Sequence, residues 1–131
     1  MATRKLISDN QASKEVMEIF DDIRQTRGTD YINNFWRQLA HDPDELKRIW
    51  NDLKRTMGPG SLDPLTKEMV YIAVSVANAC EYCVHSHTAA AAQQGMTEEQ
   101  HNELLRVIGM AARTNHLATA LQVPVDEAFK K

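Results

Sequence analysis

Two Asp-Pro pairs, Asp42-Pro43 and Asp63-Pro64, most constrain how this chain can fold. An aspartate carboxylate accepts hydrogen bonds from the free N–H groups at a helix start. Proline fits the first helical position, where its missing N–H is not needed. Each pair therefore predicts the beginning of a helix and excludes a strand that runs through it.

Apolar side chains recur three or four residues apart over most of the chain, as in amphipathic helices. The segment 65–78 is apolar on most faces, so we expect a central helix or one that faces a subunit partner. Thr97 and Gln100 have the spacing of a capping box and predict another start. The helices expected from these patterns span 8–27, 30–41, 42–57, 65–78, 80–94, 97–111 and 115–121. No strand pattern is evident, so the prediction is an all-α, single-domain bundle of six to seven helices.

Composition narrows the functional classes. A chain of 131 residues with 43% hydrophobic residues fits one domain with a packed core. The net charge of −3 gives no basic field for nucleic acid or anionic membranes. We expect no bilayer-spanning segment, because the longest apolar run is interrupted by Ser75 and Asn78. The first residues lack the apolar core of a signal peptide, so we expect a cytoplasmic protein.

The chain's two cysteines, Cys80 and Cys83, are separated by two residues at a predicted helix start. Free N–H groups and the helix dipole stabilise a thiolate there, and the thiolate is the nucleophile of cysteine chemistry. His87 follows Cys83 by one helical turn, within reach for proton transfer. Glu68 lies on the preceding predicted helix, which a crossing helix pair would bring beneath His87. These residues suggest a redox-active dithiol with a proton relay.

A zinc site is a weaker interpretation of the same residues. Its ligands would be Cys80, Cys83, His85 and His87, which one helix cannot arrange tetrahedrally around an ion. We therefore expect no metal. A thioredoxin-like fold is disfavoured because no predicted strands flank the cysteine pair.

The pattern Glu-x11-Cys-x2-Cys-x3-His, formed by Glu68, Cys80, Cys83 and His87, resembles the alkylhydroperoxidase D family. That family belongs to the carboxymuconolactone decarboxylase-like superfamily. The resemblance is strong over residues 62–95. It implies an alkylhydroperoxidase D-like helical core over residues 42–131, preceded by an N-terminal helical extension over residues 1–41, within one compact domain.

The resemblance also implies a thiol-dependent peroxidase. Cys83 would attack the peroxide, Cys80 would resolve the product into a disulfide, and Glu68 and His87 would move protons. The Cys80–Cys83 disulfide would be the redox centre, with no additional cofactor. The implied partners are a hydroperoxide substrate, an external dithiol or lipoyl-type protein reductant, and copies of the same chain in a hexamer, with a trimer as the alternative.

Other residues and functions stay open at this point. Tyr82 would line the access path to Cys83 or simply pack, and His85 would be a second proton carrier or a surface histidine. Phe35, Trp36 and Trp50 form an aromatic stripe that we expect in the core. The functional alternatives are a dithiol–disulfide oxidoreductase acting on protein or lipoyl disulfides, and a non-enzymatic oligomeric redox sensor.

Overall fold

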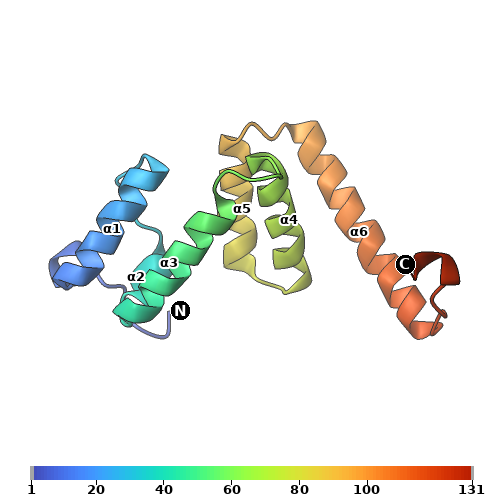
Figure 1. Cartoon of the computed structure of the whole chain (residues 1–131), viewed down its shortest axis with the longest axis horizontal. Coiled ribbons are helices and arrows are strands. Elements are labelled where there is room, and N and C mark those ends of the chain that lie inside the picture. Colours follow the sequence, from blue (N-terminus) through green and yellow to red (C-terminus); the bar gives the residue numbers. More distant parts are fainter. Residues whose placement is uncertain (1, 131) are drawn as a thin grey trace. The chain divides into compact units, whose positions relative to one another are not determined.

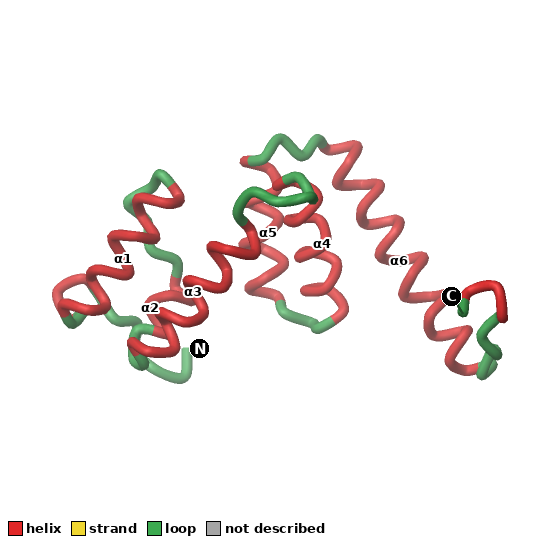
Figure 2. The backbone as a smooth tube through the Cα atoms, viewed as in Figure 1, coloured by secondary structure: helices red, strands yellow, loops and turns green. Residues whose placement is uncertain are grey.

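The computed structural model describes residues 2–130, and within that range it contains helices and no strand. The α-helices are α1 (Lys14–Arg27), α2 (Asn34–Leu39), α3 (Pro43–Met57), α4 (Pro64–Ala77), α5 (Glu81–Gln93) and α6 (Glu98–Ala120), with short 3-10 helices at Asp9–Gln11 and Glu127–Phe129 (Figures 1 and 2). The prediction of an all-α fold is confirmed.

The helix starts predicted from local capping signals are confirmed. Asp42 and Asp63 each accept the backbone N–H of the residue three positions on, at 3.0 Å. Thr97 and Gln100 form the reciprocal pair of a capping box, at 3.1 and 2.9 Å. These caps satisfy N–H groups that would otherwise lack partners, so they fix where α3, α4 and α6 begin.

Three predicted bounds are wrong. The first helix begins at Lys14 rather than near residue 8, because Ser13 caps it by accepting the N–H of Val16 at 3.2 Å. Residues 30–33 do not join α2. The two helices predicted over 97–111 and 115–121 are one helix, because the residues between them contain no glycine or proline to interrupt it.

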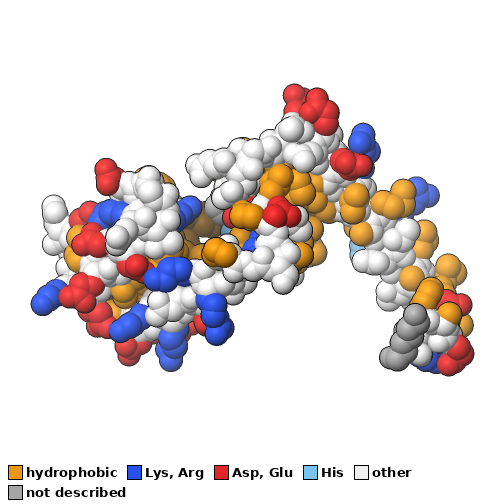
Figure 3. Space-filling model, turned by 45° about the horizontal axis from the view of Figure 1, so that its top comes forward, with side chains coloured by type: hydrophobic (Ala, Val, Ile, Leu, Met, Phe, Trp, Pro, Cys, Tyr) orange, Lys and Arg blue, Asp and Glu red, His pale blue; other side chains and the backbone are white. Residues whose placement is uncertain are grey.

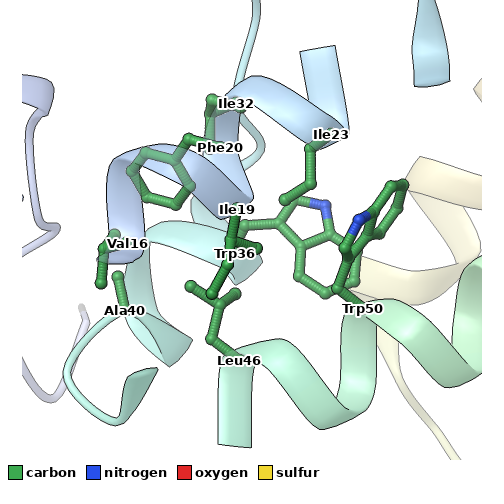
Figure 4. Close-up of a cluster of buried hydrophobic side chains, with 9 residues drawn as sticks. All are labelled: Val16, Ile19, Phe20, Ile23, Ile32, Trp36, Ala40, Leu46 and Trp50. Carbon is green, nitrogen blue, oxygen red and sulfur yellow. The ribbon is translucent and has the colours of Figure 1, made fainter. Parts of the chain in front are cut away.

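Contacts divide the chain into two compact units, one ending at Gly58 and the other beginning at Pro59. In the first unit, α3 packs with α1 and α2 around a shared apolar core. The rings of Trp36 and Trp50 meet edge to face at 5.4 Å and are buried as predicted, whereas Phe35 remains 44% exposed and departs from the prediction. The buried residues of this core are Val16, Ile19, Phe20, Ile23, Ile32, Trp36, Ala40, Leu46 and Trp50 (Figure 4).

The division of the chain differs from the sequence-based boundary after His41. Helix α3 presents Leu46 and Trp50 to the first two helices, so its apolar stripe completes their core. Contacts therefore group residues 43–57 with the N-terminal unit.

In the second unit, α4 lies beside α5 (Figure 1). Helix α4 also contacts α6. Ile72 of α4 and Ala91 of α5 are buried, and the small Ala91 allows close packing of the helices. None of the 23 residues of α6 is buried, and hydrophobic side chains lie exposed along it (Figure 3). Across the described residues, no helix combines the length and the apolar character that a bilayer crossing requires.

Candidate active site

The turn between α4 and α5 sets the position of the cysteine pair. Ala79 adopts a left-handed conformation with φ of 53°, which is uncommon for a residue with a side chain. The N–H of Cys80 donates to the carbonyl of Ser75 at 2.9 Å, and the N–H of Ala79 donates to that of Val76 at 3.1 Å. These two bonds and the left-handed residue form a Schellman motif, which ends α4 and reverses the chain. As a result, Cys80 lies directly at the start of α5.

Cys80 is the N-cap residue of α5. Its sulfur accepts the backbone N–H of Cys83 at 3.3 Å. The two cysteines form a disulfide, with their Cα atoms 5.3 Å apart. The sulfur pair therefore lies at the positive end of a helix, where an anionic sulfur is stabilised after reduction.

Glu68 of α4 and His87 of α5 form a hydrogen bond across the helix pair. Oε2 of Glu68 lies 2.7 Å from Nδ1 of His87, and the side chains are only 12% and 18% exposed. An ionised carboxylate can only accept, so Nδ1 carries the proton when Glu68 is charged. Nε2 is then the imidazole nitrogen that is left to take up a proton.

Tyr71 joins this pair, although no sequence motif marks it as a site residue. Its ring stacks on the imidazole of His87, with centroids 3.6 Å apart and planes inclined by 17°. Tyr71 follows Glu68 by one helical turn, so both side chains leave the same face of α4. That spacing was the available signal, but a ring contact between two helices also depends on how the helices pack.

The two accessory candidates occupy more open positions. Tyr82 is 44% exposed. His85 is exposed and lies on the wall of a shallow hollow of about 300 Å³ that also includes Cys80, Val76 and Val84. The structure thus associates His85 with the Cys80 hollow, rather than with the Glu68–His87 hydrogen bond.

Within residues 2–130, no three His, Cys, Asp or Glu side chains gather as a metal ion would require. The arrangement brings two pairs of side chains together on α4 and α5. These are a cysteine pair at a helix start and a carboxylate–imidazole pair on the same two helices.

A helical unit that carries this cysteine pair and this carboxylate–imidazole pair defines a class of all-α dithiol proteins. Comparison with known proteins identifies the family. The model of the carboxymuconolactone decarboxylase family matches residues 44–126. The crystal structure of the alkylhydroperoxidase AhpD core from Rhodospirillum rubrum is 59% identical in sequence and superposes with a TM-score of 0.97, covering 100% of this chain and 98% of that one. The chain belongs to the carboxymuconolactone decarboxylase family and is AhpD-like within it.

Curated relatives are more distant. An (R)-2-haloacid dehalogenase of Pseudomonas putida is 23% identical over 105 residues, which are 80% of this chain and 35% of the dehalogenase. An uncharacterized protein of Cupriavidus necator is 29% identical over 83 residues, which are 63% of this chain and 74% of that protein. The uncharacterized protein YdfG of Bacillus subtilis is 33% identical over 58 residues, 44% of this chain and 39% of YdfG. The chain spans little more than a third of the dehalogenase and of YdfG.

Proposed function

We propose that this chain is a thiol-dependent hydroperoxide reductase whose redox centre is the Cys80–Cys83 pair. The observation that carries the proposal is the placement of this pair at the start of α5, while the Glu68–His87 hydrogen bond joins α5 to α4. The similarity to an alkylhydroperoxidase core supports the same reaction class.

The first step oxidises Cys83. Nε2 of His87 takes the thiol proton, and the Cys83 thiolate attacks the distal oxygen of the hydroperoxide. The O–O bond breaks, an S–O bond forms, and the alkoxide leaves as an alcohol after taking the proton from His87. Cys83 becomes a sulfenic acid, the first product of thiolate oxidation. The Glu68 carboxylate stabilises the protonated imidazole during this transfer.

The second and third steps restore the dithiol. The Cys80 thiol loses its proton as its sulfur attacks the Cys83 sulfur, an S–S bond forms, the S–O bond breaks, and the leaving hydroxide takes up that proton and departs as water. An external dithiol, of lipoyl type on a carrier protein, then exchanges with the disulfide. It supplies two electrons and two protons and is itself oxidised to a disulfide.

The test follows the two thiols of the reduced chain during reaction with tert-butyl hydroperoxide, using timed alkylation and mass spectrometry. The wild-type chain is expected to lose both thiols and to form the disulfide. Cys83→Ser should retain its single thiol, whereas Cys80→Ser should form a sulfenic acid that dimedone traps. No thiol loss in the reduced wild-type chain would overturn the proposal.

A second candidate function is dithiol–disulfide oxidoreduction of protein or lipoyl disulfides. The observation that favours it is the open hollow beside Cys80, since an exchanging sulfur must be reached by a second sulfur. Rapid reduction of lipoamide disulfide, combined with inertness toward tert-butyl hydroperoxide, would favour this function over the first.

We also propose that the chain forms homo-oligomers, with a hexamer expected and a trimer as the alternative. The supporting observation is that α6 carries exposed apolar residues such as Leu105, Met110 and Leu117 while none of its residues is buried. A helix in a protein gains most of its stability by packing its apolar face against other elements. Light scattering of the purified chain measures the mass, and a monomer at micromolar concentration would contradict the proposal.

A further inference from the structure

We propose that Tyr71 is a positioning residue whose aromatic ring holds the His87 imidazole in the orientation that meets Glu68. The evidence for this role is geometric. The kinetic part of the proposal rests on the proposed peroxidase function, whereas the geometric part is measured without any turnover.

The His87 imidazole requires more than one restraint. Rotation about the bond between Cβ and the ring is broad for histidine, so a single hydrogen bond at Nδ1 leaves the ring plane poorly defined. A second contact that acts on the face of the ring removes this freedom. The Tyr71 ring supplies such a contact, because it lies nearly parallel to the imidazole at 3.6 Å between centroids.

The two restraints come from one helix. Glu68 and Tyr71 are one turn apart on α4, and His87 is on α5. Glu68 therefore holds one edge of the imidazole at 2.7 Å while Tyr71 covers one face of it. With edge and face both held, the imidazole cannot tilt out of the plane in which Nδ1 meets Glu68 without losing the stacked contact.

The position of Tyr71 is itself well supported. Its backbone carbonyl accepts a hydrogen bond from the Ser75 hydroxyl at 2.7 Å, and Ser75 is only 4% exposed. The neighbouring Ile72 is 1% exposed, so this turn of α4 is anchored in the second unit. A ring on an anchored turn can restrain a neighbouring ring, whereas one on a free surface cannot.

This geometry assigns the function to the ring rather than to the phenolic hydroxyl. Tyr71→Phe keeps the aromatic face and should react with tert-butyl hydroperoxide within about twofold of the wild-type rate. Tyr71→Leu removes the face, and a lost aromatic pair corresponds to a rate reduction of about 3- to 10-fold. Tyr71→Met serves as a second variant, because its flexible side chain fills the space without offering a flat face.

The decisive readout is the imidazole itself. Nitrogen-15 NMR of the chain reports which ring nitrogen of His87 carries the proton, independently of activity. The wild-type chain and Tyr71→Phe should show one His87 form, protonated at Nδ1, with a downfield Nδ1–H signal. Tyr71→Leu and Tyr71→Met should show exchange between forms and a broadened Nδ1–H signal. Tyr31→Leu is the matched control, because Tyr31 is 63% exposed in the other unit, and it should resemble the wild type.

Two results would overturn the proposal. One is an unchanged His87 signal in whichever of Tyr71→Leu and Tyr71→Met retains its helical circular dichroism. The other is a loss in Tyr71→Phe equal to that in Tyr71→Leu, which would assign the role to the hydroxyl. If the wild-type chain does not react with peroxide, the proposed function fails while the NMR comparison still decides the role of Tyr71.

Discussion

Replacing Glu68 by glutamine tests whether this carboxylate acts through His87 rather than on the substrate. Glutamine has the size of glutamate and keeps an acceptor oxygen at the same place, but it has no charge. The hydrogen bond to His87 would therefore persist as a neutral one. The difference between the two chains isolates the charge of the pair.

The size of the effect follows from the geometry. The pair is short, at 2.7 Å, and mostly buried, with the Glu68 side chain 12% exposed. Hydrogen bonds to charged groups contribute about 1.5–3 kcal/mol and are about twice as strong as neutral ones. Losing the charge should thus remove about 0.8–1.5 kcal/mol of the stabilisation of the protonated imidazole, which corresponds to a rate of thiol oxidation that is about fourfold to twelvefold lower. Removing the proton carrier itself, in His87→Gln, should lower the rate by about 100-fold or more.

The assay is the timed alkylation of reduced protein with tert-butyl hydroperoxide at pH 7. Glu81→Gln is the matched control, because Glu81 is an exposed acid in the first turn of α5, next to Cys80. It should react within about twofold of the wild-type rate. A wild-type rate in Glu68→Gln would refute the reasoning. So would a loss in Glu68→Gln as large as that in His87→Gln, because Glu68 would then carry the proton itself.

Four further outcomes concern stability and are measured by urea unfolding. Phe20→Ala should lower the free energy of unfolding of the first unit by about 3–5 kcal/mol, because the Phe20 ring is 0% exposed, and the fluorescence of Trp36 and Trp50 reports it. Ser13→Ala should cost about 1 kcal/mol by removing the cap of α1, and a change below about 0.3 kcal/mol would contradict that role. Hydrogen bonds from Lys54 and Trp50 hold the pKa of Asp22 in the folded chain below its ordinary value of 3.8. The ionised Asp22 therefore stabilises the fold fully at pH values above 3.8, and this stabilisation is lost as the pH falls through the lower pKa of the folded chain. In Asp22→Asn the free energy of unfolding should therefore fall less steeply below about pH 4 than in the wild type. The same pH dependence in both chains would contradict this. Ala79→Gly should stabilise the second unit by about 0.5–1 kcal/mol, because the backbone strain relieved at φ of 53° exceeds the conformational entropy that glycine adds to the unfolded chain. A lower free energy of unfolding would contradict this balance.

Local signals explain what could be predicted of the fold. The caps at Asp42, Asp63 and Thr97 act within four residues, so the sequence alone was sufficient to place those starts. The start of the first helix was misplaced because both Ser8 and Ser13 can cap. The choice between them depends on contacts elsewhere. Asp9 pairs with Arg24 and Arg37, and these long-range pairs accompany a separate 3-10 turn before α1.

The site likewise contains contacts that local sequence predicts and contacts that depend on tertiary packing. The adjacency of Cys80 and Cys83 follows from their spacing, and their disulfide needs no information beyond one helix turn. The contact between Glu68 and His87 depends on how α4 and α5 cross, which the motif suggested and the periodicity could not fix. The stacking of Tyr71 was missed because two ring planes are set by tertiary packing, for which a single sequence carries no marker.

Cys80 combines two duties in one atom, since its sulfur both caps α5 and shares the covalent bond with Cys83. The cap is already in place while the bond exists, so opening the bond need not create a new helix boundary. In the proposed peroxidase cycle the backbone would therefore stay almost stationary, and the far-ultraviolet circular dichroism spectrum should be the same for the dithiol and the disulfide. The external dithiol of that cycle would then have to detect the oxidised chain by direct contact with a sulfur atom, because the start of α5 would be the same before and after reduction.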